Sequence, residues 1–180
     1  MIGCEAAGCT PPLERVMLPI EPPGKALIDG RSDFTAAVRT ALSEAARERA
    51  RELCFVDADF DAWPLDDGAV LSALAAWARL PKRRLLVIAG RFDDVPRRFP
   101  QFTAWRRTWA HLIECRATDV EASQIPTLLL AGPHSLQLAD RLHWRGHWLA
   151  DDSEISAWRE VVDALVQRSE LDFPANTLGL

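Results

Sequence analysis

The sequence contains no tyrosine and only two lysines, Lys25 and Lys82, beside 19 arginines and seven tryptophans. Its longest apolar run, residues 85–90, is much shorter than the ~20 residues that a membrane-spanning helix needs. The N-terminus also lacks the basic and then apolar order of a secretory signal. These absences predict a cytoplasmic protein without a membrane partner.

Complete catalytic and cofactor motifs are missing as well. The sequence has no Gly-x-Ser-x-Gly elbow, no Walker loop and no dinucleotide-binding glycine pattern. No Cys or His pair at zinc-finger spacing follows Cys4 and Cys9. Cys54 and Cys115 lie within apolar runs, where a free thiol packs as a small hydrophobic group. The main interpretation therefore assigns no catalytic residue, no resident metal and no cofactor.

Apolar residues alternate between helical spacing and short buried runs. Of the 180 residues, 48% are hydrophobic and 26% are charged, which is typical of a globular domain. Helices are predicted at about residues 32–51, 67–78, 99–109 and 153–166, and strands at 53–56, 85–88, 111–115, 127–131 and, as short antiparallel pieces, between 136 and 148. This order predicts the α/β class, with a mixed, mainly parallel sheet and helices on both faces.

Proline content distinguishes the start of the chain from the rest. Residues 1–24 contain five prolines and little periodic pattern, so we expect a disordered or extended N-terminal arm. Residues 25–170 are predicted to form a single α/β domain, and residues 171–180 a loose C-terminal tail.

Three carboxylates, Asp57, Asp59 and Asp61, follow the first buried strand. Ligands commonly bind at the carboxyl ends of strands in α/β sheets, and neighbouring carboxylates can hold Mg²⁺. If the strand continues, its alternation places all three on one side. The Asp-x-Asp pattern resembles the nucleophile motif of haloacid-dehalogenase-type phosphatases, but no Gly-Asp-x-x-x-Asp follows it. The cluster is a candidate metal or anion site, and the alternative is a solvated loop.

Charge is distributed unevenly along the chain. Residues 79–116 carry a net charge of +7 and the remainder −12, which gives the formal net charge of −5. Within this basic segment, Arg97, Arg98, Arg106 and Arg107 are candidate anion-binding residues, because arginine forks suit phosphate groups. The alternative is the solvated face of a helix, with Arg106 and Arg107 directed away from its apolar stripe.

Three phrases of the sequence carry a family resemblance: DADFDAWPL at residues 57–65, RFDDVPRRFP at 91–100 followed by WRRTWAH at 105–111, and VQRS at 166–169. They resemble an uncharacterised bacterial family whose fold is similar to one half of the phospholipase D superfamily, over about residues 25–170. Such a half commonly pairs with a second copy, so the resemblance implies a homodimer with a twofold axis. The seven tryptophans favour the same interpretation, because tryptophan is a frequent interface anchor.

The catalytic motif of phospholipase D proteins, His-x-Lys-x-x-x-x-Asp, is degenerate in this chain. Its first position matches His134, but Leu136 stands where the lysine is needed, and Asp140 comes one place early. The resemblance therefore implies the scaffold without the phosphodiesterase reaction.

The main prediction is a non-catalytic domain that acts in protein interaction or self-association, as a homodimer or with an unknown protein partner. One alternative is a phosphate-ligand-binding protein or a metal-dependent phosphohydrolase that uses Asp57, Asp59 and Asp61. Another is nucleic-acid binding through the basic segment, residues 79–116, although nucleic acid is not the partner that we expect.

Overall fold

A computed structural model describes residues 27–149 and 151–174. The predicted N-terminal arm, residues 1–24, lies outside the described residues, and so do residues 175–180 of the predicted tail. The predicted extent of the α/β domain, residues 25–170, stays a prediction. In the part of the chain that is described, none of the helices has the length and apolar character that a membrane crossing requires.

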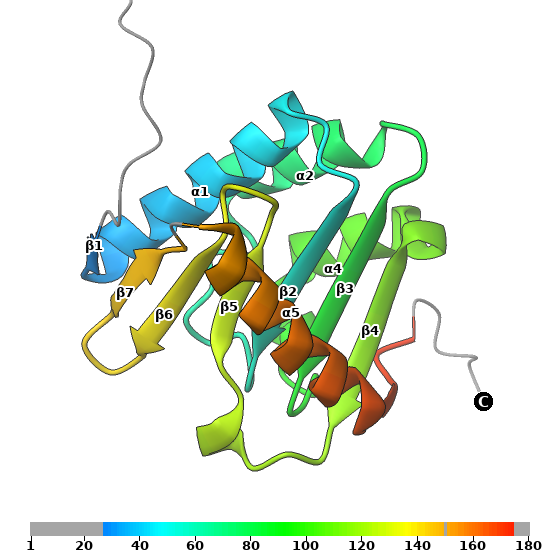
Figure 1. Cartoon of the computed structure of the whole chain (residues 1–180). Coiled ribbons are helices and arrows are strands. Elements are labelled where there is room, and N and C mark those ends of the chain that lie inside the picture. Colours follow the sequence, from blue (N-terminus) through cyan, green and yellow to red (C-terminus); the bar gives the residue numbers. More distant parts are fainter. Residues whose placement is uncertain (1–26, 150, 175–180) are drawn as a thin grey trace, which may run out of the picture.

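Eight strands form one mixed sheet in the order β1-β7-β6-β5-β2-β3-β4-β8 (Figure 1). The strands are β1 (Leu27–Asp29), β2 (Glu52–Asp57), β3 (Arg84–Ala89), β4 (Ile113–Thr118), β5 (Thr127–Leu130), β6 (Leu136–Asp140), β7 (Arg145–Trp148) and β8 (Ser169–Leu171). The pairs β2–β3 and β3–β4 are parallel, and the other neighbouring pairs are antiparallel. The predicted α/β class and mixed sheet are confirmed, with parallel pairing confined to three adjacent strands.

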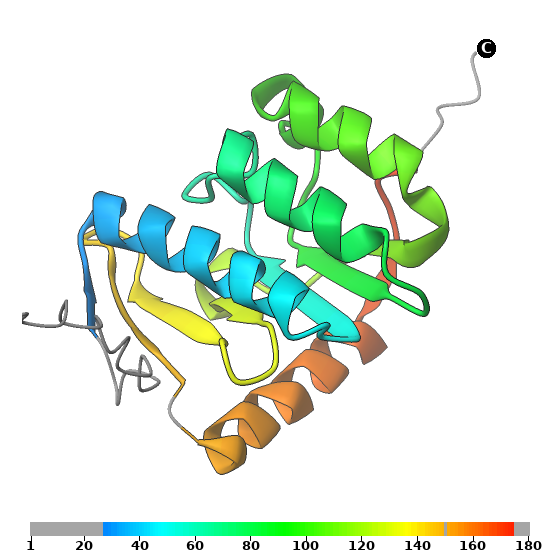
Figure 2. The same ribbon diagram turned by 90° about the horizontal axis from the view of Figure 1, so that it is seen from above.

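Helices cover both faces of the sheet. The helices α1 (Arg31–Arg47), α2 (Gly68–Ala78), α3 (Val95–Arg98) and α4 (Pro100–Thr108) precede β5, and α5 (Asp152–Gln167) follows β7. Figure 2 shows α1, α2 and α4 side by side on one face, with α5 alone on the other. The central strands β2 and β3 are buried over most of their length because both of their faces are covered.

Each face of the sheet has its own hydrophobic core. Beneath α1 and α2, residues such as Phe34, Phe55 and Trp77 are fully buried. Beneath α5, a smaller cluster includes Val56 and Val162. All seven tryptophans are buried or partly buried, and the partly buried ones pack against these two clusters. The tryptophans therefore fill the core and its margin, which removes one reason for expecting a dimer interface.

Candidate functional site

The first candidate site, the acidic loop that follows β2, is organised around Asp57. This carboxylate is completely buried and accepts hydrogen bonds from the backbone N–H groups of Asp59 (3.1 Å) and Phe60 (2.9 Å). It also accepts from Trp63 Nε1 (3.1 Å) and Thr127 Oγ1 (2.5 Å). These donors turn the chain sharply after Asp57, because an aspartate that bonds the backbone two residues ahead forms a turn. Asp57 therefore has a structural role in shaping this loop.

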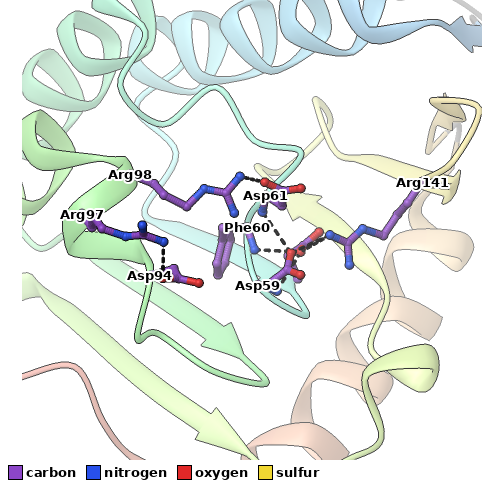
Figure 3. Close-up of polar contacts among 8 residues, drawn as sticks. Asp59, Phe60, Asp61, Asp94, Arg97, Arg98 and Arg141 are labelled. Carbon is purple, nitrogen blue, oxygen red and sulfur yellow. Dashed lines mark hydrogen bonds and ion pairs between the residues drawn. The ribbon is translucent and has the colours of Figure 1, made fainter.

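The other two carboxylates of the loop are each neutralised by an arginine (Figure 3). Asp59 Oδ1 lies 2.6 Å from Arg141 Nη2, which also lies 3.3 Å from Asp57 Oδ1. Asp61 forms an ion pair with Arg98. The two arginines approach the loop from opposite sides, Arg98 from α3 and Arg141 from the connection between β6 and β7.

The expected alternation of the three carboxylates does not occur, because β2 ends at Asp57 and Phe60 adopts a left-handed backbone with φ of 59°. Among the described residues, the three do not form a group whose ligand atoms converge for a metal ion. Each already has its own donors, so the geometry favours a closed polar loop over an Mg²⁺ site.

The four candidate anion-binding arginines do not form a common binding surface for an anion. Arg97 pairs with Asp94 (2.7 Å), and Arg98 pairs with Asp61. Arg107 is exposed on α4. Arg106 was expected to face solvent, but it is buried. It lies one helical turn after Phe102 on α4, and residues four apart share a helix face, so both side chains face the core.

Arg106 is only 5% exposed. Its Nε donates a hydrogen bond to Cys115 Sγ (3.1 Å), and its guanidinium lies 4.5 Å from the centre of the Phe173 ring. A cation against an aromatic face retains favourable electrostatics away from water. Arg106 therefore stabilises the packing of α4 and β4 and does not face a ligand.

The two described cysteines are buried, as expected. Burial raises the pKa of Cys54 to about 12, and burial is also the main reason that the pKa of Cys115 is raised. A thiol held in its protonated form is a poor nucleophile, so neither cysteine has the properties of a catalytic residue.

His134, the degenerate motif position, lies in the turn between β5 and β6. Its Nε2 is 3.1 Å from Glu48 Oε2, at the C-terminal end of α1. Leu136 stands where the motif needs a lysine, and the acidic partner of His134 is Glu48, directly after α1. The arrangement differs from a histidine and lysine aligned along one strand.

A second candidate site is a group of cations at the amino ends of β2 and β3, opposite the acidic loop. It consists of Arg49 and Arg51, just before β2, with Lys82 and Arg83, just before β3; these four residues are called the basic patch. The two loops lie side by side, because the backbone N–H of Arg84 donates to the carbonyl of Arg51 (3.1 Å). Figure 1 shows both loops at the upper end of the sheet.

The electrostatics of the basic patch are unusual for a protein with net negative charge. Burial, and then the adjacent charges of Arg49 and Arg51, lower the pKa of the Arg83 guanidinium. None of the four cations has a carboxylate partner within ion-pair distance among the described residues. Arg83 Nε has neither solvent contact nor a hydrogen-bond partner in this part of the chain. The patch is therefore a group of four cations without ion-pair partners in the described part of the chain.

Two members of the basic patch also have strained backbones. Arg49 has a φ of 59° and Lys82 a φ of 57°. This left-handed region favours glycine, and bulky side chains are uncommon there. Phe60, Trp144 and Phe173 adopt the same region elsewhere, so this backbone is shared with positions outside the patch.

Sequence reasoning missed the basic patch because its two halves are about 30 residues apart in the chain. A signal was nevertheless present: Arg49-x-Arg51 and Lys82-Arg83 each stand directly before a buried strand. Parallel pairing of two consecutive strands brings their amino ends together.

Comparison with known proteins gives one structural likeness. No protein-family model matches the chain, and no curated protein matches it. The structure of TrmBL2, described as an archaeal chromatin protein with a novel mode of DNA binding, is similar with a TM-score of 0.60 and 16% sequence identity. The match covers 88% of this chain and 57% of that chain, so this chain spans little more than half of the neighbour's length.

That neighbour contradicts two predictions from the sequence. The expectation of a non-catalytic domain that acts in protein interaction or self-association is wrong, and so is the expectation that nucleic acid is not the partner. The homodimer stays a prediction. The physical reason lies in the placement of residues. The tryptophans that suggested an interface belong to the core, and cations without partners gather on two loops that looked unrelated in the sequence.

Proposed function

We propose that this chain binds nucleic acid, with duplex DNA as the ligand, through the basic patch of Arg49, Arg51, Lys82 and Arg83. The observation that carries the proposal is the meeting of Arg83 with Arg49 and Arg51 across two neighbouring loops, with Lys82 next to Arg83 in sequence and without ion-pair partners, in a protein of net charge −5. Localised positive charge attracts a polyanion even where the molecule as a whole is acidic. Fold similarity to a chromatin protein that is described as DNA-binding supports the same function.

The geometry favours contacts with phosphates over the reading of bases. The basic patch lies on two short loops, whereas base-specific proteins place a helix or a β-ribbon in the major groove. Arginine and lysine contacts to phosphate position a protein on the duplex but carry no sequence information. We therefore expect similar affinity for duplexes of different sequence.

The site differs from the segment that the sequence suggested. Of residues 79–116, only Lys82 and Arg83 belong to the basic patch, and Arg49 and Arg51 come from outside it. A metal-dependent phosphohydrolase is not proposed, because the carboxylates of the acidic loop are already bound by protein donors. The phospholipase D-like scaffold and the cytoplasmic location remain proposals that the sequence motivates.

The test compares two variants that lose the same charge at different places. In one, Arg49→Gln and Arg51→Gln remove two cations from the basic patch. In the control, Arg31→Gln and Arg91→Gln remove two exposed cations at the start of α1 and after β3. Binding of a fluorescent 20-base-pair duplex is measured by anisotropy at about 50 mM salt.

The patch variant is expected to weaken duplex binding at least tenfold, because each lost phosphate contact costs roughly five- to tenfold at this ionic strength. The control variant should bind within twofold of the parent protein. Equal weakening by both variants would show that net charge alone governs binding and would contradict the assignment of the site. Absence of duplex binding by the parent protein would contradict the function itself.

A further inference from the structure

Two carboxylates at the C-terminal end of α1 meet one imidazole from the turn between β5 and β6. Glu44 lies in the last turn of α1, Glu48 directly follows that helix, and His134 lies in the turn between β5 and β6. Among the described residues, these three form the one group of histidine, cysteine or acidic side chains whose potential ligand atoms all lie within 4.8 Å of one another.

The buried ring nitrogen of the imidazole, His134 Nε2, lacks a hydrogen-bond partner in the described part of the chain. His134 Nε2 has no solvent contact and no hydrogen bond of acceptable geometry within the described part of the chain, although Glu48 Oε2 is 3.1 Å away. Buried polar atoms normally have partners, so an exception calls for a physical reason. A metal ion that accepts the nitrogen lone pair would satisfy this atom.

The two carboxylates already converge on a cation. Arg47 Nη2 lies 2.5 Å from Glu44 Oε2 and 2.9 Å from Glu48 Oε1. The guanidinium side chain is 67% exposed, so it can leave without opening the core. A small divalent ion between the same oxygens would replace one positive charge by two and would also reach the imidazole.

From this geometry we propose that Glu44, Glu48 and His134 bind a divalent transition-metal ion, with Zn²⁺ as the best match. One imidazole nitrogen and two carboxylate oxygens suit Zn²⁺, and a water completes the tetrahedron. Ligands at about 2.1 Å from the ion stand roughly 3.4 Å apart, so small side-chain rotations close the site. The site uses none of the four residues of the basic patch and joins α1 to the β5–β6 turn.

The experiment measures Co²⁺ binding by its visible absorption, followed by displacement with Zn²⁺. It uses the full chain with Cys4→Ser and Cys9→Ser, because these two thiols are the competing ligands that lie outside the described residues. Saturable binding of one Co²⁺ per chain is expected. His134→Gln and Glu44→Gln should each weaken it at least tenfold, whereas Arg47→Gln should strengthen it, because the resident cation is removed.

Two replacements of exposed groups elsewhere, His111→Gln and Glu160→Gln, serve as controls and should leave Co²⁺ affinity unchanged. The proposal is overturned if the parent protein shows no saturable binding, or if His134→Gln and Glu44→Gln bind as the parent does. If either of these variants fails to fold, Arg47→Gln decides alone: unchanged or weaker Co²⁺ binding by that variant would contradict the site.

Discussion

At the scale of single residues, Asp57 and Arg106 are buried charges for which protein groups replace water. Asp57 has four hydrogen-bond donors and the nearby Arg141 guanidinium. Arg106 has a thiol and an aromatic face. Such residues resemble ligand-binding groups in a sequence, but their partners show that they stabilise the fold. Residues of the basic patch differ because they lack such partners.

We expect Asp57→Ala to lower the free energy of unfolding by about 3 kcal/mol or more, because several buried donors lose their acceptor at once. Chemical denaturation followed by tryptophan fluorescence measures this change. Asp93→Ala, an exposed aspartate in the β3–α3 connection, is the control and should change stability by less than about 0.5 kcal/mol. A small effect at Asp57 would show that the loop can be organised without its carboxylate.

A pH dependence follows from Asp67, which caps α2 and accepts two bonds from Arg39. Those bonds are the main reason that the pKa of Asp67 is lowered. A lowered carboxyl pKa in the folded state stabilises the protein above the unfolded-state pKa, and this stabilisation is lost as the pH falls through the folded-state pKa.

Urea unfolding between about pH 6 and pH 3 tests this contribution. The parent protein should lose stability more steeply toward low pH than Asp67→Asn. Asparagine retains the helix cap but cannot titrate, so the variant isolates the charge. Parallel stability curves for the two proteins would contradict the role of the Arg39–Asp67 pair.

At the scale of secondary-structure elements, the backbone conformations at the ends of α1 and β2 place the basic patch and the acidic loop. The C-terminal end of α1 closes with the backbone N–H of Arg49 bonded to the Ala46 carbonyl (3.3 Å) and that of Ala50 bonded to the Ala45 carbonyl (2.8 Å). This pattern normally places glycine in the left-handed position. Here Arg49 occupies the left-handed position with a φ of 59°. One cation of the basic patch therefore has a backbone conformation that is unfavourable for a residue with a side chain.

Arg49→Gly is therefore expected to change stability and affinity in opposite directions. Stability should stay equal or rise by up to about 1 kcal/mol, because glycine relieves the left-handed strain. Affinity for duplex DNA should fall roughly five- to tenfold through loss of one phosphate contact. Thermal unfolding and anisotropy titration on the same sample provide both values. Loss of stability without loss of affinity would show that Arg49 has a structural role only.

Apolar periodicity predicted the longer elements but not β1, α3 or β8, and local polar contacts decided where the elements end. The spacing of Phe34, Val38 and Leu42 correctly placed α1 over the core. The strand predicted at residues 111–115 begins two residues later, at Ile113, because residues 110–112 form a 3-10 turn. The end of β2 depends on the hydrogen bond that the Asp57 carboxylate accepts from the backbone N–H of Phe60. The spacing of apolar residues carries no information about this bond.

The site was predictable only in part. Alternation along a continued β2 suggested three carboxylates on one side, whereas after the turn Asp57 and Asp59 share Arg141 and Asp61 pairs with Arg98. Arg106 was expected in solvent, but α4 directs it into the core one turn after Phe102. The basic patch depends on the parallel pairing of β2 and β3, and strand neighbours are not evident from sequence spacing.

At the scale of the whole molecule, the two ends of the central strands have different electrostatic characters. At the carboxyl end of β2, the acidic loop is neutralised by arginines from α3 and the β6–β7 connection. At the amino end, none of the four cations of the basic patch has an ion-pair partner among the described residues. If the proposed function holds, the basic patch faces the polyanion and the acidic remainder of the surface faces away from it.

The dependence of duplex affinity on salt concentration tests this account most directly. Binding through four phosphate contacts predicts that the logarithm of the association constant falls against the logarithm of salt concentration with a slope of about −3.6. The Arg49→Gln and Arg51→Gln double variant should reduce the slope by nearly two, and the Arg31→Gln and Arg91→Gln control should leave it unchanged. A slope that is the same in the parent protein and the patch variant would contradict the basic patch as the DNA-binding surface.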